Sequence, residues 1–241
     1  PPARLYNKPM LSQTIKTRGL HTGVRFAPAA QLDKAHKQQF QIKASEGFDW
    51  RRQEYAENAW HLVSPQSQGD PRSQLKLSVG PDLLNFEDFF PTGPFEVYLD
   101  NLRMALNTVA SVFNPRLIVA TGVIIRLTAQ SAGDDARVFL GQRCLGLDER
   151  LSPLGRPVHA VGLKLLLPPL PGADKPNWQA EVKVETLIED VRQLFIEVDA
   201  RWAQPGPWDP QVAVDRAKIA HEFATTRIVD LLKELGGADS K

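Results

Sequence analysis

Two charged residues on one expected strand, Glu181 and Lys183, are of the types that metal-dependent nucleases use. Residues two apart on a strand face the same way, so the carboxylate can hold Mg²⁺ while the lysine stabilises the charged transition state. The mechanism also needs an upstream aspartate, and the near candidate is Asp174 in a proline-containing loop. Alternating Glu and Lys is common on solvated strands, so the sequence favours a solvated face over a nuclease site.

Other residues of catalytic or metal-binding type are dispersed along the chain. The histidines lack the spacing of zinc motifs; they are His21, His36, His61, His159 and His221. The usual glycine-rich nucleotide-binding motifs, GxSxG and HExxH are missing. Cys144 has no histidine close to it in sequence, which indicates an inert buried thiol. The sequence therefore predicts no catalytic residue, no metal ligand and no cofactor.

Basic residues are concentrated at the start of the chain. Residues 1–60 hold ten Lys or Arg against five Asp or Glu. Beside aromatic rings, cations can bind phosphates while the rings stack on bases, so a nucleic-acid or partner-binding surface is predicted here. Its candidate residues are Arg4, Lys8, Lys16, Arg18, Arg25, Arg51 and Arg52. The alternative is a solvated arm beside rings that belong to the core.

The composition is that of an ordinary globular protein. The 241 residues are 42% hydrophobic and 24% charged, and 29 basic residues nearly balance 28 acidic ones. This length forms one large domain or two small ones, and the balanced charge identifies no partner. One cysteine, no signal peptide and no long apolar run predict a cytoplasmic protein without a membrane partner.

The hydrophobic pattern predicts an α+β protein made of two similar β-β-β-α units with mainly antiparallel sheets, each covered by a long helix. The predicted strands are 20–26, 59–64, 74–80, 116–129, 158–167, 178–188 and 194–203, and the long helices are 94–113 and 209–235. The strand at 116–129 is apolar on both faces, which is typical of a central strand. The expected organisation is an extended basic arm at 1–18, a first unit with the central strand at 19–130, and a second unit with a short leading helix at 131–241.

The apolar seam of the last helix shifts around its axis after Thr225 and Thr226. Either the helix bends there or its second half packs on something else, such as another subunit. This half is therefore a candidate interaction helix, with contact residues Ile228, Leu231, Leu232 and Leu235.

Several short motifs follow one another along the chain in an order that resembles that of a known protein family. They are Phe26-Ala27-Pro28, Trp60 with Leu62, Gly122 to Arg126, Val198-Asp199, and His221-Glu222-Phe223 followed by Ile228. In this order they resemble an uncharacterised, sporadically distributed prokaryotic family of similar length. That family places an arginine and an aromatic residue directly after the glycine-leucine pair of its central strand, whereas this chain has Val123, Ile124 and Ile125 there. The resemblance implies a mobile-element or defence-associated gene and no catalytic residue.

These observations predict a non-enzymatic binding or assembly module, as one component of a multi-protein system. Its expected partner is another protein or a second copy of the chain. The alternative is a nucleic-acid-binding protein that uses the basic N-terminal segment, and the third hypothesis is the metal-dependent nuclease.

Overall fold

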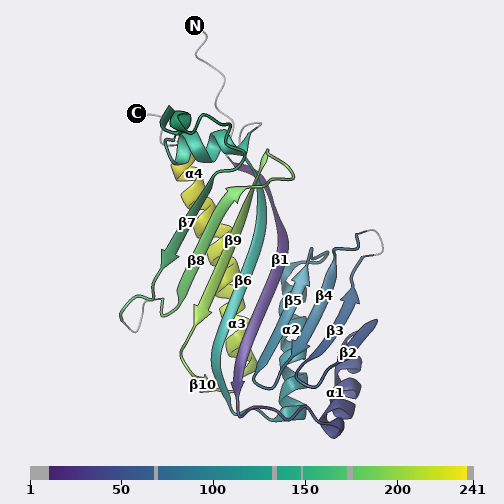
Figure 1. The fold of residues 1–241 in the computed structure, drawn as a ribbon. Helices are drawn as coiled ribbons and strands as arrows, with labels where there is room; N and C mark the ends of the chain where they lie inside the picture. The colour runs from purple at the N-terminus through teal and green to yellow at the C-terminus, as the bar shows by residue number, and fades with distance from the viewer. Residues whose placement is uncertain (1–10, 68–69, 132–134, 148, 173–175, 238–241) are drawn as a thin grey trace.

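The computed structural model describes residues 11–67, 70–131, 135–147, 149–172 and 176–237 (Figure 1). Within them, ten strands form one sheet in the order β2-β3-β4-β5-β1-β6-β9-β8-β7, with the short β10 beside β6. Neighbouring strands run antiparallel. The strands are β1 (Leu11–Ala27), β2 (Arg52–Tyr55), β3 (Trp60–Pro65), β4 (Gln74–Val79), β5 (Leu83–Phe89), β6 (Leu117–Ser131), β7 (Gly162–Leu167), β8 (Gln179–Thr186), β9 (Gln193–Trp202) and β10 (Gly206–Pro207).

The α+β class is confirmed, but the expected pair of similar β-β-β-α units is wrong. The two longest strands, β1 and β6, pair from Leu11 opposite Ser131 to Ala27 opposite Leu117, and so join all the strands into one sheet. β6 pairs with β9 on its other side, which confirms the central position expected from its apolar sequence on both faces. Neither β2 nor β5 is among the predicted strands, and β5 is the strand that connects the meander of β2, β3 and β4 with β1.

The two long helices lie behind the sheet in Figure 1 and leave its other face open, while the short helical segments between β6 and β7 lie at the upper end of the sheet. The burial of the strand residues agrees with this arrangement. Along β4, β5, β8 and β9, buried residues that face the helices alternate with half-buried residues that face the open side. The helical segments are α1 (Lys34–Gly47), α2 (Phe95–Phe113), the π-helical η1 (Val138–Cys144), the 3-10 helix η2 (Glu149–Leu154), α3 (Pro210–Glu222), the π-helical η3 (Phe223–Ile228) and α4 (Val229–Gly237). One cluster of buried apolar side chains fills the space between sheet and helices.

The two long helices agree with the sequence pattern. α2 starts after Pro94 and ends before Asn114, whose left-handed conformation (φ 47°) closes the helix. The last helix starts after Asp209, which caps it by accepting a hydrogen bond from the Gln211 N–H at 2.8 Å. The shift of its apolar seam is caused by η3, since a π-helical turn contains more residues than an α-helical turn and rotates everything that follows.

Two segments of the N-terminal region are more ordered than the pattern indicated. Residues 11–18, expected in the extended arm, are the first part of β1. The ambiguous polar stretch after residue 31 contains α1, which is capped by Asp33 and anchored in the core by Phe40 and Ala44. Its polar surface hides the helix from a periodicity test, because only two of its side chains are buried.

Candidate functional site

The sheet has an inner corner where β5 ends beside the middle of β1. Phe90 follows β5 with φ 49°, a conformation that is strained for a residue with a side chain. Its N–H donates to the Arg18 carbonyl at 3.0 Å, and its carbonyl accepts from Ser73 Oγ at 2.9 Å. These bonds hold the chain as it leaves the sheet, so β5 pairs only with residues 19–25 of β1.

The Phe90 ring lies beside two guanidinium groups. Arg72 Cζ is 4.4 Å and Arg18 Cζ is 5.7 Å from the ring centroid, both within cation–π range. Arg72 also forms a 2.8 Å ion pair with Asp70 and lowers the pKa of that carboxyl group to about 2. Arg18 Nε instead donates to Thr128 Oγ1 at 3.0 Å. Within the described part of the chain, Arg18 and the exposed Lys16 form no ion pair.

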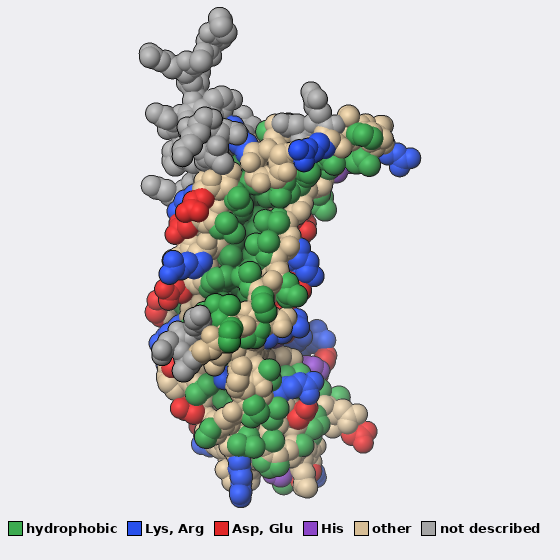
Figure 2. Space-filling model, turned by 90° about the vertical axis from the view of Figure 1, so that its left-hand side faces the viewer, with side chains coloured by type: hydrophobic (Ala, Val, Ile, Leu, Met, Phe, Trp, Pro, Cys, Tyr) green, Lys and Arg blue, Asp and Glu red, His purple; other side chains and the backbone are tan. Residues whose placement is uncertain are grey.

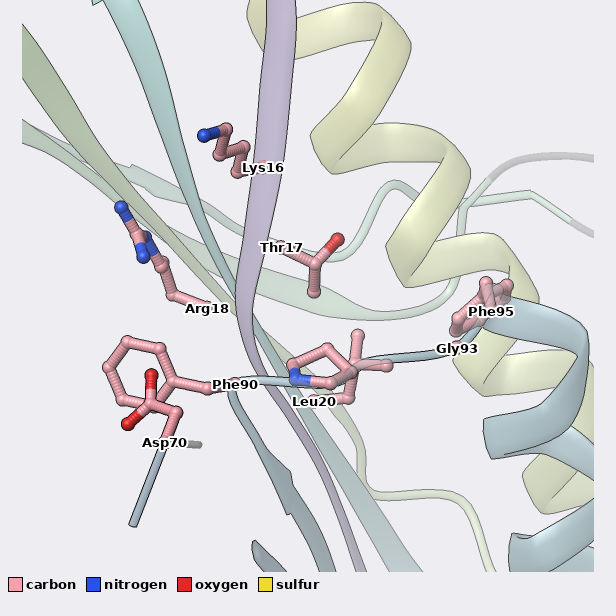
Figure 3. Close-up of a pocket in the computed structure, with 9 residues that line it drawn as sticks. Lys16, Thr17, Arg18, Leu20, Asp70, Phe90, Gly93 and Phe95 are labelled. Atoms are coloured by element: carbon pink, nitrogen blue, oxygen red, sulfur yellow. The ribbon is translucent and has the colours of Figure 1, made fainter. Parts of the chain in front are cut away.

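A pocket of about 390 Å³ occupies this corner, and we call it the corner slot. Its lining residues are Lys16, Thr17, Arg18, Leu20, Asp70, Phe90, Pro91, Gly93 and Phe95. Figure 3 shows Lys16, Arg18 and Asp70 on one side of β1, with Thr17 and Phe95 on the other. A bulge in the pairing with β6 between Thr17 and Gly19 turns Arg18 to the same side as Lys16. The corner slot therefore lies in the plane of the sheet, alongside β1.

A second hollow, of about 370 Å³, lies on the open face where Gly23 of β1 is opposite Gly122 of β6. A Cβ on Gly23 would lie 2.8 Å from Asn85 Oδ1, whereas one on Gly122 would meet nothing within 4 Å. The two guanidinium groups at its rim are neutralised, since Arg25 pairs with Asp82 at 2.9 Å and Arg201 pairs with Asp199. The hollow is thus mainly apolar and presents paired charges.

Glu181 and Lys183 lie on the open face, as a strand requires, and belong to a chain of ion pairs. Glu181 Oε1 is 2.9 Å from Lys164 Nζ and 3.4 Å from Lys183 Nζ. Lys183 Nζ is 3.0 Å from Glu197 Oε1, and Glu197 Oε2 is 2.8 Å from Arg126 Nε. The pKa of Glu181 is lowered, first by its hydrogen bond with Lys164. This arrangement is that of a solvated, charge-paired strand face.

The expected third nuclease ligand, Asp174, lies outside the described residues. Among the residues that the structure describes, no three His, Cys, Asp or Glu side chains are grouped to hold a metal ion. The described part of the chain also has no helix that is long and apolar enough to cross a membrane. Cys144 is half-buried, and burial raises the pKa of its thiol to about 11.

The sheet also has an apolar edge at β7. Figure 2 faces this edge and shows a column of hydrophobic side chains running along it. Leu163 and Leu165 are opposite the buried Val184 and Val182 of β8, which places them on the helix side of the sheet. Leu166 is 61% exposed on the open face. Three other large exposed side chains of the same half of the molecule are Leu167, Leu170 and Ile219.

The predicted basic residues do not form one surface. Lys16 and Arg18 meet in the corner slot, while Arg25 lies at the central hollow. Arg51 and Arg52 lie at the start of β2, where they pair with Asp49 and Glu54. Arg4 and Lys8 lie outside the described residues. Sequence reasoning missed the contributions of Asp70, Arg72 and Phe90, because the unrecognised β5 is what brings them to β1.

The candidate interaction helix is partly covered by its own chain. Ile228 and Leu232 are buried, and Leu231 and Leu235 are half-buried. α4 packs against η1, so the rotated seam is used within the chain. Of the four candidate residues, Leu231 and Leu235 remain partly exposed for a further contact.

Comparison with protein-family models and with curated proteins found no match for this chain.

Proposed function

We propose that this protein is a non-enzymatic assembly module that pairs with a second copy of itself through the edge of β7. The observation that carries the proposal is the contrast between the two outer strands of the sheet. β2 at one edge exposes Arg52, Gln53 and Glu54, and such charged edges resist pairing with another chain. β7 at the other edge has the sequence Gly-Leu-Lys-Leu-Leu-Leu and carries one charge.

The surroundings of β7 are suited to a second strand. Its leucines on the helix side continue into an aromatic cluster, in which the Trp178 ring lies 5.1 Å from Phe223 and 5.3 Å from Trp202 between centroids. Trp178 and Phe223 are only partly buried, so the edge of the apolar layer remains open. An added strand would cover this layer and satisfy the free backbone groups of β7.

β7 is self-complementary when two copies pair antiparallel with Leu165 at the two-fold axis. Leu163 then lies opposite Leu167 of the partner subunit on the helix side. On the open face Lys164 lies opposite Leu166 of the partner subunit, so that like charges do not face one another. Lys164 keeps its own ion pair with Glu181 in this register.

The charge on the open face favours assembly over the nucleic-acid alternative. Its cations are largely neutralised within the chain, as in the pairs of Lys76 with Glu87 and Arg126 with Glu197. Lys16 and Arg18 alone are too few to follow a phosphate backbone, which is held by a continuous basic groove. The nucleic-acid hypothesis would rest on these two residues and on the N-terminal segment outside the described residues.

The test is the molecular mass in solution, measured by light scattering over a range of concentrations. We expect twice 26.8 kDa. Leu166→Lys places a positive charge opposite Lys164 of the partner subunit, twice by symmetry, and should weaken the dimer by about 1 kcal/mol, or about fivefold in Kd.

Leu166→Glu has the opposite sign and should preserve or strengthen the dimer. Gln53→Lys on β2 is the control and should leave the mass unchanged. A single-chain mass at the highest concentration would refute the proposal, and so would equal effects of Leu166→Lys and Leu166→Glu.

A further inference from the structure

The corner slot lies beside a stretch of β1 that, among the residues described by the structure, has a neighbouring strand on one side only. β6 pairs with β1 from Leu11 to Ala27, whereas β5 pairs only with residues 19–25. Because the Arg18 carbonyl accepts from the Phe90 N–H, the seven residues 11–17 have an edge without a strand partner among the described residues, about 24 Å long at the usual rise per residue. Such an edge is a template for an added strand from another chain.

The strained conformation of Phe90 is what leaves this edge free. If the chain continued from Phe89 in extended conformation, β5 would run alongside residues 11–18. Instead Phe90 turns the chain toward α2, and bonds to Arg18 and Ser73 hold it there. A strained residue that is fixed by its surroundings often marks a binding site.

The two sides of the corner slot differ in chemistry. Lys16 and Arg18 lie on the side of the open face, with Arg72 beside them at the Phe90 ring. On the helix side the lining residues include Leu20 and Phe95. Because side chains alternate along a strand, an added strand that fits both sides has acidic residues at every second position and apolar residues between them.

We propose that the corner slot binds an extended acidic segment of another protein, which adds as a strand beside residues 11–17 of β1. The carboxylates of the segment pair with Lys16 and Arg18, and its apolar side chains point toward α2. Within the described part of the chain Arg18 uses Nε for Thr128, which leaves its two terminal nitrogens for a carboxylate. This site is separate from the β7 edge and does not depend on self-association.

A peptide fits the corner slot better than a nucleic acid. Asp70 lines the slot and is paired with Arg72 at 2.8 Å, and because its charge acts on carboxylates and phosphates alike it does not discriminate between the two ligands. The slot is in the plane of the sheet, where a strand obtains hydrogen bonds along its whole length. A nucleic acid would gain the two cations without this pairing.

The proposal can be tested with the full chain and an eight-residue peptide of alternating Glu and Val, blocked at both ends and labelled with fluorescein. Anisotropy should show saturable binding. The double variant Lys16→Glu with Arg18→Glu should weaken binding about tenfold or more, because two charge-assisted contacts become repulsive. The matched control is Lys43→Glu with Lys218→Glu, which changes the net charge equally on exposed helix positions and should leave binding unchanged.

Two further probes distinguish an added strand from general charge attraction. Two peptides are N-methylated at alternate residues, one at the odd and one at the even positions, and each loses the backbone donors on one edge. Because only one edge of an added strand faces β1, one of the two peptides should fail to bind. A single-stranded oligonucleotide of eight nucleotides should bind more weakly than the peptide. The proposal is overturned if the peptide fails to saturate, if both double variants weaken it equally, or if the oligonucleotide binds more tightly.

Discussion

Asp88 of β5 is a buried acid whose ionisation should oppose folding. It is 5% exposed and lies opposite Leu20 of β1 and Leu75 of β4 on the helix side of the sheet. Among the described residues its Oδ1 has no hydrogen-bond partner. Burial raises the pKa of the carboxyl group from 3.8 to about 6, partly offset by a hydrogen bond with Gln66.

The sign of the effect follows from this raised pKa. Below pH 3.8 the group is protonated in both the folded and the unfolded chain, and no free energy of unfolding is lost. Between pH 3.8 and about 6 only the unfolded chain ionises, so stability falls as the pH rises. A shift of about two pKa units corresponds to about 3 kcal/mol, and the full loss is present above pH 6.

We therefore expect Asp88→Asn to be more stable relative to the natural sequence at pH 8 than at pH 4, by about 2 to 3 kcal/mol. Urea unfolding at both pH values measures this difference. Glu87→Gln removes a charge from the open-face side of the same strand and serves as the control for net charge. If the unfolding free energies of the natural sequence and of Asp88→Asn change with pH in parallel, burial does not oppose the ionisation of Asp88 and the prediction is wrong.

Two more predictions concern the central hollow and the thiol. Gly23→Ala should cost about 1 kcal/mol of unfolding free energy, because the new methyl group displaces Asn85 from its bond with His21, while Gly122→Ala should be neutral or slightly stabilising. Urea midpoints of the two variants decide this, and equal midpoints would contradict it. Cys144, with a thiol pKa near 11 instead of 9.0, should react with iodoacetamide about 100-fold more slowly in the folded than in the urea-unfolded chain. Equal labelling in both states, measured by mass spectrometry, would show that the thiol is accessible.

The sequence predicts elements with a strong period and fails where partners lie far away in the chain. α2 is anticipated almost to the residue because one of its faces is almost wholly apolar. β5 also alternates, but its buried face includes Asp88, and this polar residue interrupts the apolar pattern. Without β5 the sheet divides into two apparent units, which is why the predicted topology is wrong.

The candidate site residues could likewise be predicted only where their signal is local in the sequence. Lys16 and Arg18 are marked by their charge and by their place in a basic segment. Their neighbours Arg72 and Phe90 come from a turn and from the end of a strand, and only tertiary structure brings the guanidinium groups of Arg18 and Arg72 within 6 Å of the Phe90 ring. The split seam of the last helix is visible in the sequence, but its cause is the local winding at η3.

The π-helical turn at η3 accommodates one extra residue in the last helix. It sets the angle at which α4 meets η1, and it does so with one more residue than a regular helix would need. Deleting one residue between 223 and 228 would let the segment adopt α-helical winding and leave α4 in nearly the same orientation, with Leu232 still buried. Deleting one residue within the α-helical part of α3 would instead rotate everything that follows by about 100°. Across related chains, the loss of one residue should therefore be tolerated at this turn and not in the regular helix before it.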